Sequence, residues 1–141
     1  MKSLPFLILI LVFILTIWNP ASLALHASSV VSAFSTRSTL ALAFLAVRIV
    51  TTSLGVAAGI ALWVRRPGAI WLTKLALVLF AIQTAVRFST GIDVGAAAPG
   101  TRLPLAILIV SHNAAWFVYL HLSRRVRAAY GLESQPEQVR N

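Results

Sequence analysis

Strongly polar side chains occur inside the long apolar segments of this 141-residue chain, among them Arg48, Gln83, His112 and Asn113. Polar and charged groups inside a membrane are costly unless they bind one another or a polar ligand, so each is a candidate for function. Arg87 lies one helical turn beyond Gln83 and would add a second positive charge. The chemistry that these residue types favour is the binding of an anion or of a lipid head group.

Helical rise predicts that these polar groups lie at a similar depth. Arg48 precedes the end of its apolar segment by fifteen residues, and Gln83 follows the start of the next segment by fourteen. At 1.5 Å per residue, both lie about 21–22 Å from the same boundary. The sequence therefore predicts an outward-facing polar pocket formed by Arg48, Gln83, Arg87, His112 and Asn113. The alternative is that Arg48 extends to the surface while the others form interhelical hydrogen bonds that fix the packing.

The apolar segments hold no combination of residues that suits catalysis or metal binding. The chain has no cysteine, and its acids, Asp93, Glu133 and Glu137, all lie outside these segments. Ser111 and His112 are adjacent, so they point about 100° apart on a helix and do not form a nucleophile–base pair. A haem would need a second histidine at the depth of His112, and none lies there. We expect no enzyme activity, no metal and no cofactor.

Composition places the chain in a membrane. Hydrophobic residues make up 59% of it and charged residues only 11%, which is too few polar groups to cover a soluble domain of this size. The net charge of +9 would suggest nucleic acid in a soluble protein. Here the basic residues mostly flank apolar segments, where they act as topology signals and lipid contacts. We therefore predict an integral membrane protein that does not bind nucleic acid.

The apolar segments predict an all-α fold, a transmembrane four-helix bundle. It forms a single domain over residues 1–131, followed by a disordered cytoplasmic tail over residues 132–141. The tight turn at Arg65–Gly68 makes the second and third spans an antiparallel hairpin. The last helix is expected to continue past the membrane to Tyr130, with Gly131 as its C-cap. The predicted spans are residues 4–18, 40–63, 69–88 and 103–122.

The first apolar segment has two interpretations, because its fifteen residues are short for a span. It can be a retained span that ends or bends at Asn19-Pro20, with Trp18 at the membrane interface. It can instead be the hydrophobic part of a signal peptide that is cleaved after about Ala24. In either case, residues 21–38 are expected to form a short surface helix or a loop.

Basic residues predict the orientation. When both termini and the Arg65–Arg66 turn are placed on one side, that side carries eight Lys and Arg residues and the other side three. The positive-inside rule then places both termini in the cytoplasm. Arg124, Arg125 and Arg127 directly follow the last span, and we expect them to anchor the chain to anionic lipids of the cytoplasmic leaflet.

Gly55 and Gly59 form a Gly-x-x-x-Gly pattern in the second span. Such small residues let two helix backbones approach closely. The pattern is compatible with a face for homo-oligomers or another membrane protein, and equally with close packing inside the bundle. The sequence leaves both alternatives open.

The end of the last span resembles that of a family of small, uncharacterised bacterial four-span proteins. In that family an aromatic-Tyr stretch is followed by Ser-x-Arg-Val and then by another aromatic residue. The matching residues here are Tyr119, Ser123, Arg125, Val126 and Tyr130, whereas Val118 stands where the family usually has proline. The resemblance covers about fifteen residues and the four-span layout. It implies a bacterial inner-membrane protein and no particular activity.

Two hypotheses on function follow. The first is a non-enzymatic accessory or assembly protein for other membrane proteins, favoured by the small extramembrane mass and the lack of a catalytic pair. The second is a small transporter, or a module that binds an anion or a lipid in the outer polar pocket. A protein partner that copurifies would favour the first hypothesis, and a bound lipid or anion would favour the second.

Overall fold

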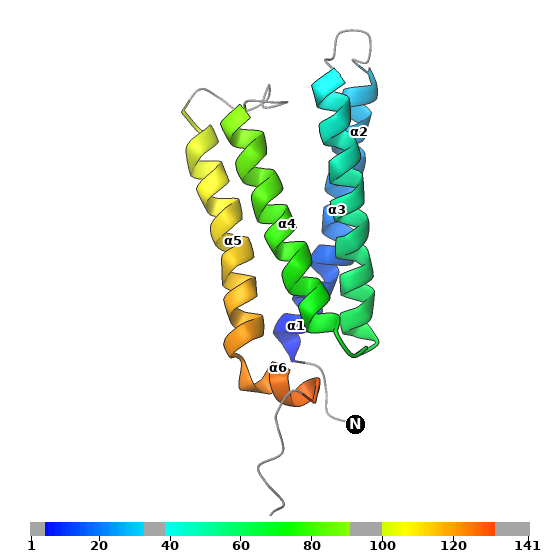
Figure 1. Cartoon of the computed structure of the whole chain (residues 1–141), viewed down its shortest axis with the longest axis vertical. Coiled ribbons are helices and arrows are strands. Elements are labelled where there is room, and N and C mark those ends of the chain that lie inside the picture. The colour runs from blue at the N-terminus through cyan, green and yellow to red at the C-terminus, as the bar shows by residue number, and fades with distance from the viewer. Residues whose placement is uncertain (1–4, 33–38, 91–99, 132–141) are drawn as a thin grey trace, which may run out of the picture.

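The computed structural model describes residues 5–32, 39–90 and 100–131, and within them the chain is helical with no strand. Four helices are long and apolar enough to cross a membrane (Figure 1). The first is continuous over Phe6–Ser32 and is divided into α1 (Phe6–Phe13), η1 (Ile14–Trp18) and α2 (Asn19–Ser32). The others are α3 (Thr39–Trp63), α4 (Ala69–Thr90) and α5 (Arg102–Leu122). The predicted fold class, an all-α bundle of four membrane-type helices, is confirmed.

The helices pack as two pairs that diverge towards one end of the molecule. The first helix packs along α3, and α4 packs along α5, while α3 and α4 are joined by a tight turn and also pack together. Helix α5 and the first helix do not form one of the extensive pairs. We call the end where the first helix begins and the α3–α4 turn lies the basal end, and the opposite end the open end (Figure 1).

The apolar core lies mostly towards the basal end. Ile8 and Leu11 of α1, Leu62 of α3 and Leu120 of α5 are fully buried there. Large apolar side chains cover the outside of all four helices. This distribution is expected of helices that face lipid, because lipid tails and apolar side chains mix without cost.

The first helix is longer than predicted, because it continues through Pro20 to Ser32. Proline lacks the N–H that would bond to the carbonyl of Thr16, and its ring would clash with that carbonyl in a regular α-helix. The π-turn η1 directly precedes this position and widens the backbone, which lets a membrane helix pass a proline. The predicted end of the first span at Trp18 is therefore wrong, and residues 21–32 form neither a loop nor a separate surface helix.

The first helix also supplies core side chains. Ile8, Leu11 and Leu15 are at most 1% exposed and pack in the main apolar cluster. Loss of this helix would expose that cluster. The packing thus favours the retained span over the signal-peptide alternative, which stays a prediction to be checked by sequencing the N-terminus.

The turn between α3 and α4 is a Schellman motif. Arg66 N–H donates to the carbonyl of Ala61 at 2.9 Å, and Arg65 N–H donates to the carbonyl of Leu62 at 3.2 Å. Arg65 has a φ of +55°, in the left-handed region that favours glycine. Helix α4 begins at Ala69, so the predicted antiparallel hairpin is present with the expected bounds.

The last helix breaks at Ser123 and does not run on to Tyr130 as predicted. Ser123 has an extended backbone, and its hydroxyl accepts a hydrogen bond from Val126 N–H at 3.4 Å as the N-cap of α6 (Arg124–Ala129). Helix α6 lies across the basal end (Figure 1) with Val126 fully buried. The Tyr130 hydroxyl donates to the carbonyl of Leu62 at 2.7 Å. The break is favoured because it brings Val126 and Tyr130 against the bundle.

The environment of Tyr130 is partly desolvated. Burial raises the pKa of Tyr130 to about 12, while the positive charge of Arg65 lowers it to a lesser extent. The neutral phenol is therefore the form that the folded chain favours, and it is the form that can donate to the Leu62 carbonyl.

Gly55 and Gly59 lie inside the bundle. A Cβ atom added at Gly55 would stand 2.9 Å from Cε2 of Phe80, and one at Gly59 would stand 2.6 Å from Cγ2 of Thr16. The glycines therefore bring α3 close to α4 and to the first helix. This packing favours the alternative of close contact inside the bundle, and a role of these glycines in an intermolecular face stays a prediction.

The described basic residues that flank the spans divide between the two ends in the predicted groups, whereas Lys2, Arg37 and Arg140 lie outside the described residues. Arg65, Arg66 and Lys74 lie at the basal end together with the arginines of α6, whereas Arg87 and Arg102 lie towards the open end (Figure 1). The predicted tail at residues 132–141 lies outside the described residues. Which end faces the cytoplasm stays a prediction from the positive-inside rule.

Candidate functional site

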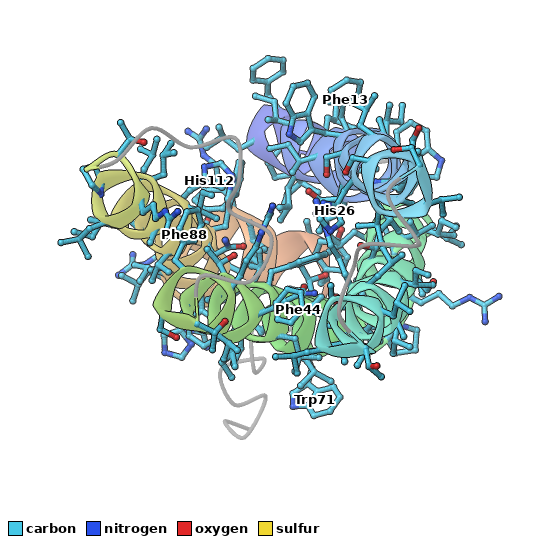
Figure 2. All side chains as sticks on the ribbon, turned by 90° about the horizontal axis from the view of Figure 1, so that it is seen from above. Phe13, His26, Phe44, Trp71, Phe88 and His112 are labelled. Atoms are coloured by element: carbon cyan, nitrogen blue, oxygen red, sulfur yellow. The ribbon has the colours of Figure 1, made fainter. Side chains whose placement is uncertain are left out.

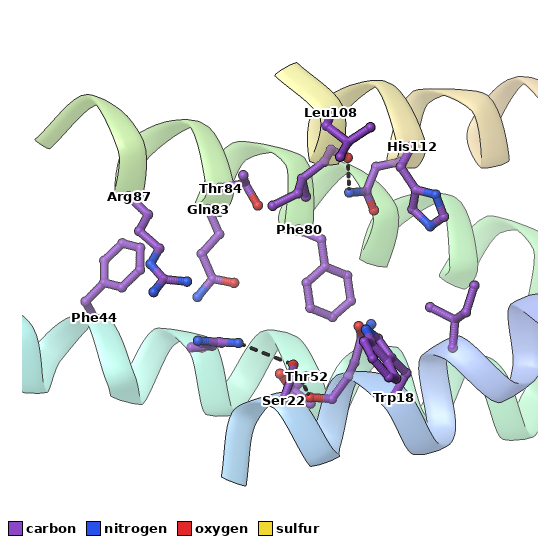
Figure 3. A pocket seen from close by; sticks show the side chains of 15 residues that line it. Trp18, Ser22, Phe44, Thr52, Phe80, Gln83, Thr84, Arg87, Leu108 and His112 are labelled. Atoms are coloured by element: carbon purple, nitrogen blue, oxygen red, sulfur yellow. Dashed lines mark hydrogen bonds between the residues drawn. The ribbon is translucent and has the colours of Figure 1, made fainter. Parts of the chain in front are cut away.

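One cavity of about 460 Å³ lies between the two helix pairs, in the half of the bundle towards the open end (Figure 3). The first helix, α3, α4 and α5 all contribute to its wall. The cavity is lined by all the side chains from which the sequence predicts a polar pocket, namely Arg48, Gln83, Arg87, His112 and Asn113.

Arg48 is half-buried and directed into the cavity by a contact with the first helix. Its Nη2 donates to the hydroxyl oxygen of Ser22 at 3.3 Å, and the Ser22 hydroxyl donates to the carbonyl of Asn19 at 2.9 Å (Figure 3). This contact favours the pocket, and the alternative in which Arg48 extends to the surface stays a prediction. This contact exists only because the first helix continues past Pro20 to reach the depth of Arg48.

Gln83 connects α4 to α3 at the depth predicted from helical rise. Its Oε1 accepts a hydrogen bond from the Thr51 hydroxyl at 2.9 Å, and Thr51 is buried. Its Nε2 is buried and has no hydrogen-bond partner within the described part of the chain. Because a buried amide N–H costs free energy when it is unpaired, Gln83 presents a donor that a ligand oxygen would satisfy.

Arg87 lies beside Gln83 on the same face of α4, and both side chains extend towards α3 (Figure 3). We call Arg48, Gln83 and Arg87 the donor cluster. Among the residues described, the cavity wall contains two arginines and no acidic residue. Two guanidinium groups and one amide N–H are donors of the kind that bind phosphate and carboxylate oxygens.

His112 and Asn113 line the same cavity but are engaged on their own helix. Nε1 of Trp116 donates to Nε2 of His112 at 3.1 Å, and the two rings meet edge to face. Nδ2 of the buried Asn113 donates to the carbonyl of Ile109 at 2.8 Å. These bonds lie within α5, so the predicted interhelical bonds of His112 and Asn113 are not found among the described residues. Only Gln83, through Thr51, forms one.

The cavity wall also contains large apolar and aromatic side chains, in addition to its polar groups. These residues are Ile14, Trp18, Phe44, Phe80, Leu108 and Ile109, and Phe44 lies beside Arg87 (Figure 3). Trp18 and His112 are exposed and belong to the two helices that do not pack extensively together. Seen from above, His112 lies on the side of α5 that faces the first helix (Figure 2). The cavity thus reaches the lipid-facing surface between α5 and the first helix.

Sequence reasoning missed the four lining residues of the first helix, Ile14, Trp18, Asn19 and Ser22. It ended the span at the proline, so it left this part of the wall out. One signal could have revealed them: no Lys, Arg, Asp or Glu occurs between Lys2 and Arg37. An uncharged segment of that length can hold a complete span that includes a tolerated proline.

The predicted basic anchor is located at the basal end. Arg124, Arg125 and Arg127 are all exposed on α6, which lies across the ends of the spans (Figure 1). Among residues 5–32, 39–90 and 100–131, no group of three His, Cys, Asp or Glu side chains is placed to hold a metal ion.

Comparison of the chain with protein-family models, curated proteins and solved structures finds no match. The resemblance carried by the end of the last span therefore stays a prediction. Its matching residues nevertheless have physical roles here: Ser123 caps α6, Val126 fills the base of the bundle, and Tyr130 bonds to the end of α3. Tyr119 meets Trp116 edge to face at 5.9 Å between ring centroids.

Proposed function

We propose that the protein binds one anionic amphiphile in the cavity between the helix pairs. The acidic head group contacts the donor cluster, and the apolar tail leaves between α5 and the first helix. The observation that carries this proposal is the joint presence, in one cavity, of two guanidinium groups, the buried amide N–H of Gln83 and large apolar and aromatic side chains. This is the second of the two hypotheses that the sequence raises.

The donor cluster favours an oxyanion over a neutral ligand. Bringing a guanidinium group into an apolar region costs free energy, and an anion at hydrogen-bond distance offsets that cost. Arg48 and Arg87 approach from different helices, so together with Gln83 they can contact different oxygens of one head group. A phosphate or carboxylate satisfies all three donors, whereas a cation would be repelled.

The apolar wall favours a ligand with a tail over a small inorganic anion. The cavity volume of about 460 Å³ lies within the usual range of 300–1,000 Å³ for ligand sites. Phe44, Phe80 and Trp18 provide large apolar contact areas, and their burial by an acyl chain contributes about 25 cal/mol per Å². The side opening lets such a ligand come from the bilayer itself.

We further propose that the bundle lies in a bacterial inner membrane with its basal end in the cytoplasm and that it has no enzymatic activity. The charge division between the two ends supports the orientation. The cavity then faces the outer leaflet. A series of reporter fusions after residues 67 and 131 checks the orientation, and activity of a periplasmic reporter at either position would contradict it.

Ligand binding is tested with the full chain in nanodiscs of phosphatidylcholine that contain a minority of phosphatidylglycerol. Native mass spectrometry counts the phosphatidylglycerol retained per chain. We expect Arg48→Leu and Arg87→Leu each to reduce retention at this site about tenfold, because each removes a charge-assisted contact. The matched control is Arg102→Leu, an exposed arginine at the open end that does not line the cavity. Equal retention by all three variants would contradict the proposal.

A second variant tests the sign of the charge without creating a void. Gln83→Glu keeps the size of the side chain and places a carboxylate between the two arginines. This internal carboxylate competes with an external anion, so binding should be lost while the folded bundle remains. Full retention of phosphatidylglycerol by folded Gln83→Glu would show that the donor cluster does not hold the head group.

A further inference from the structure

A second cavity of about 420 Å³ lies at the basal end, on the opposite side of the molecule from the donor cluster. Two parts of the chain that are far apart in the sequence form it: the start of the first helix, and the end of α5 together with the following helix α6. Phe6 and Leu7 supply its apolar wall, and Tyr119 and Arg125 supply its polar groups. The cavity shares no lining residue with the first one.

The position of α6 places these groups at the membrane boundary. Val126 of α6 is fully buried against the bundle, whereas Arg125 is exposed. A short helix with one buried apolar side and an arginine-rich outer side lies flat at the level of the lipid head groups. Tyr119 is three residues inside the end of α5, which places it about 4.5 Å deeper. Polar donors thus occupy the rim of the cavity.

The apolar wall lies beside these donors, at the start of the first helix. Phe6 is 74% exposed and Leu7 is 44% exposed there. A side chain as large as Phe6 on a lipid-facing helix presents its area to an acyl chain. A cationic donor beside exposed apolar side chains suits a phospholipid, whose phosphate and acyl chains meet at the membrane boundary.

We infer that the basal cavity is a specific site for one anionic phospholipid of the adjacent leaflet. Its phosphate contacts Arg125, its head-group region accepts the Tyr119 hydroxyl, and an acyl chain lies along Phe6 and Leu7. The bound lipid joins α6 to the first helix. This site is separate from the one in the proposed function and does not depend on it.

A specific site makes a different prediction from general attraction to an anionic surface. General attraction contributes about 1 kcal/mol for each arginine near the surface, so it treats neighbouring arginines alike. Arg124 and Arg127 lie on the same helix as Arg125 and are equally exposed, yet they do not line the cavity. Replacing each of the three arginines in turn therefore removes the same charge from a different position on α6.

The experiment uses the full chain in the same phosphatidylglycerol-containing nanodiscs, with native mass spectrometry as the readout. We expect Arg125→Gln to reduce the basal retention of phosphatidylglycerol about tenfold, since a bidentate contact to phosphate is lost. Arg124→Gln and Arg127→Gln should change it less than about twofold. Equal losses in the three variants would overturn the inference in favour of general attraction.

A steric variant tests the cavity without changing the charge. Ala129→Phe adds a ring to a residue of α6 that lines the cavity, and it should displace the lipid while all three arginines remain. Retention that is unchanged in folded Ala129→Phe would overturn the inference. The two sites are distinguished by crossing the variants: Arg48→Leu should remove only the lipid of the first cavity, and Arg125→Gln only that of the basal cavity.

Discussion

The basal half of the bundle is closed around small and branched apolar residues, whereas the open half is held apart by aromatic and polar ones. In the basal half, Gly59 lets the first helix approach α3 so closely that a Cβ atom would not fit. In the open half, the same helix pair presents Phe44 and Arg48 to a cavity. Helix separation in a membrane follows side-chain size, because no hydrophobic force between helices compensates for a poor fit.

Gly55 marks the border between the two halves. The ring of Phe80 packs directly over it, and the same ring lines the cavity on its other side. Helix α3 can therefore pack closely in the basal half and line a cavity in the open half, because Gly55 and Gly59 lie towards its basal end. The closed half provides stability, and this leaves the open half free to contain charges that would weaken a tightly packed core.

The largest effect is expected at Gly59, where a substitution tests the close packing of the basal half. Gly59→Val adds atoms where a Cβ would already stand 2.6 Å from Cγ2 of Thr16 and 3.2 Å from Cβ of Leu15. We expect a loss of about 3 kcal/mol in the free energy of unfolding, at the upper end of overpacking effects. Thermal unfolding in detergent measures it. Ala57→Val, on an exposed face of the same helix, is the control and should change stability by less than about 0.5 kcal/mol.

The second prediction concerns the opposite half. Arg48→Leu removes a charge from the middle of α3, where arginine costs about 2.5–3.5 kcal/mol on insertion scales. Its hydrogen bond to Ser22 is long, at 3.3 Å, and is expected to contribute little. We expect unfolding stability to be unchanged or raised, while phosphatidylglycerol binding is lost. Arg48→Lys should restore binding only in part, because lysine lacks the planar fork.

If Arg48→Leu lowered the free energy of unfolding as much as Gly59→Val does, the contrast between the two halves of the bundle would be wrong. Arg48 would then be a packing element, and the open half would resemble the basal half. A folded Arg48→Leu variant that keeps full phosphatidylglycerol binding would leave the packing argument intact and remove Arg48 from the site.

Much of this arrangement follows from local sequence signals. The bounds of α3, α4 and α5 lie within two residues of the predicted spans, because charges, Pro67 and Gly68 mark where the apolar segments end. The common depth of Arg48 and Gln83 was also predictable. Helical rise is constant, and a tight turn fixes the relative height of two antiparallel helices.

The rest depends on contacts that no local pattern encodes. The passage of the first helix through Pro20 rests on a π-turn, and the break at Ser123 rests on the burial of Val126 and the bond from Tyr130 to α3. The face of Gly55 and Gly59 was ambiguous because small residues suit any close neighbour. The packing of the whole bundle decides which helix lies against these glycines.

The third prediction tests how the basal end is closed, through the titration of Tyr130. Its folded-state pKa of about 12 exceeds the ordinary value of 10.0, so between these values the folded chain holds a proton that the unfolded chain has lost. The contribution of Tyr130 to stability should therefore be fully present below pH 10 and be lost as the pH rises towards 12. Tyr130→Phe should cost about 1 kcal/mol below pH 10 and abolish this loss. A variant with the same alkaline profile as the wild type would place the titration elsewhere.

The smallest effect is expected at Thr51, which tests how much one interhelical hydrogen bond in the open half contributes to stability. Thr51→Val keeps the shape of the side chain and removes the hydrogen bond to Oε1 of Gln83, which is 2.9 Å long. Interhelical hydrogen bonds in membranes contribute about 0.6 kcal/mol on average, so unfolding should be affected by no more than about that amount. Gln83 would lose the bond that orients its amide, and phosphatidylglycerol binding should weaken more than stability does. The comparison is sharpened by measuring both quantities on the same sample. A loss of several kcal/mol in stability with unchanged binding would show that this bond fixes the packing of α3 on α4 and does not serve the cavity.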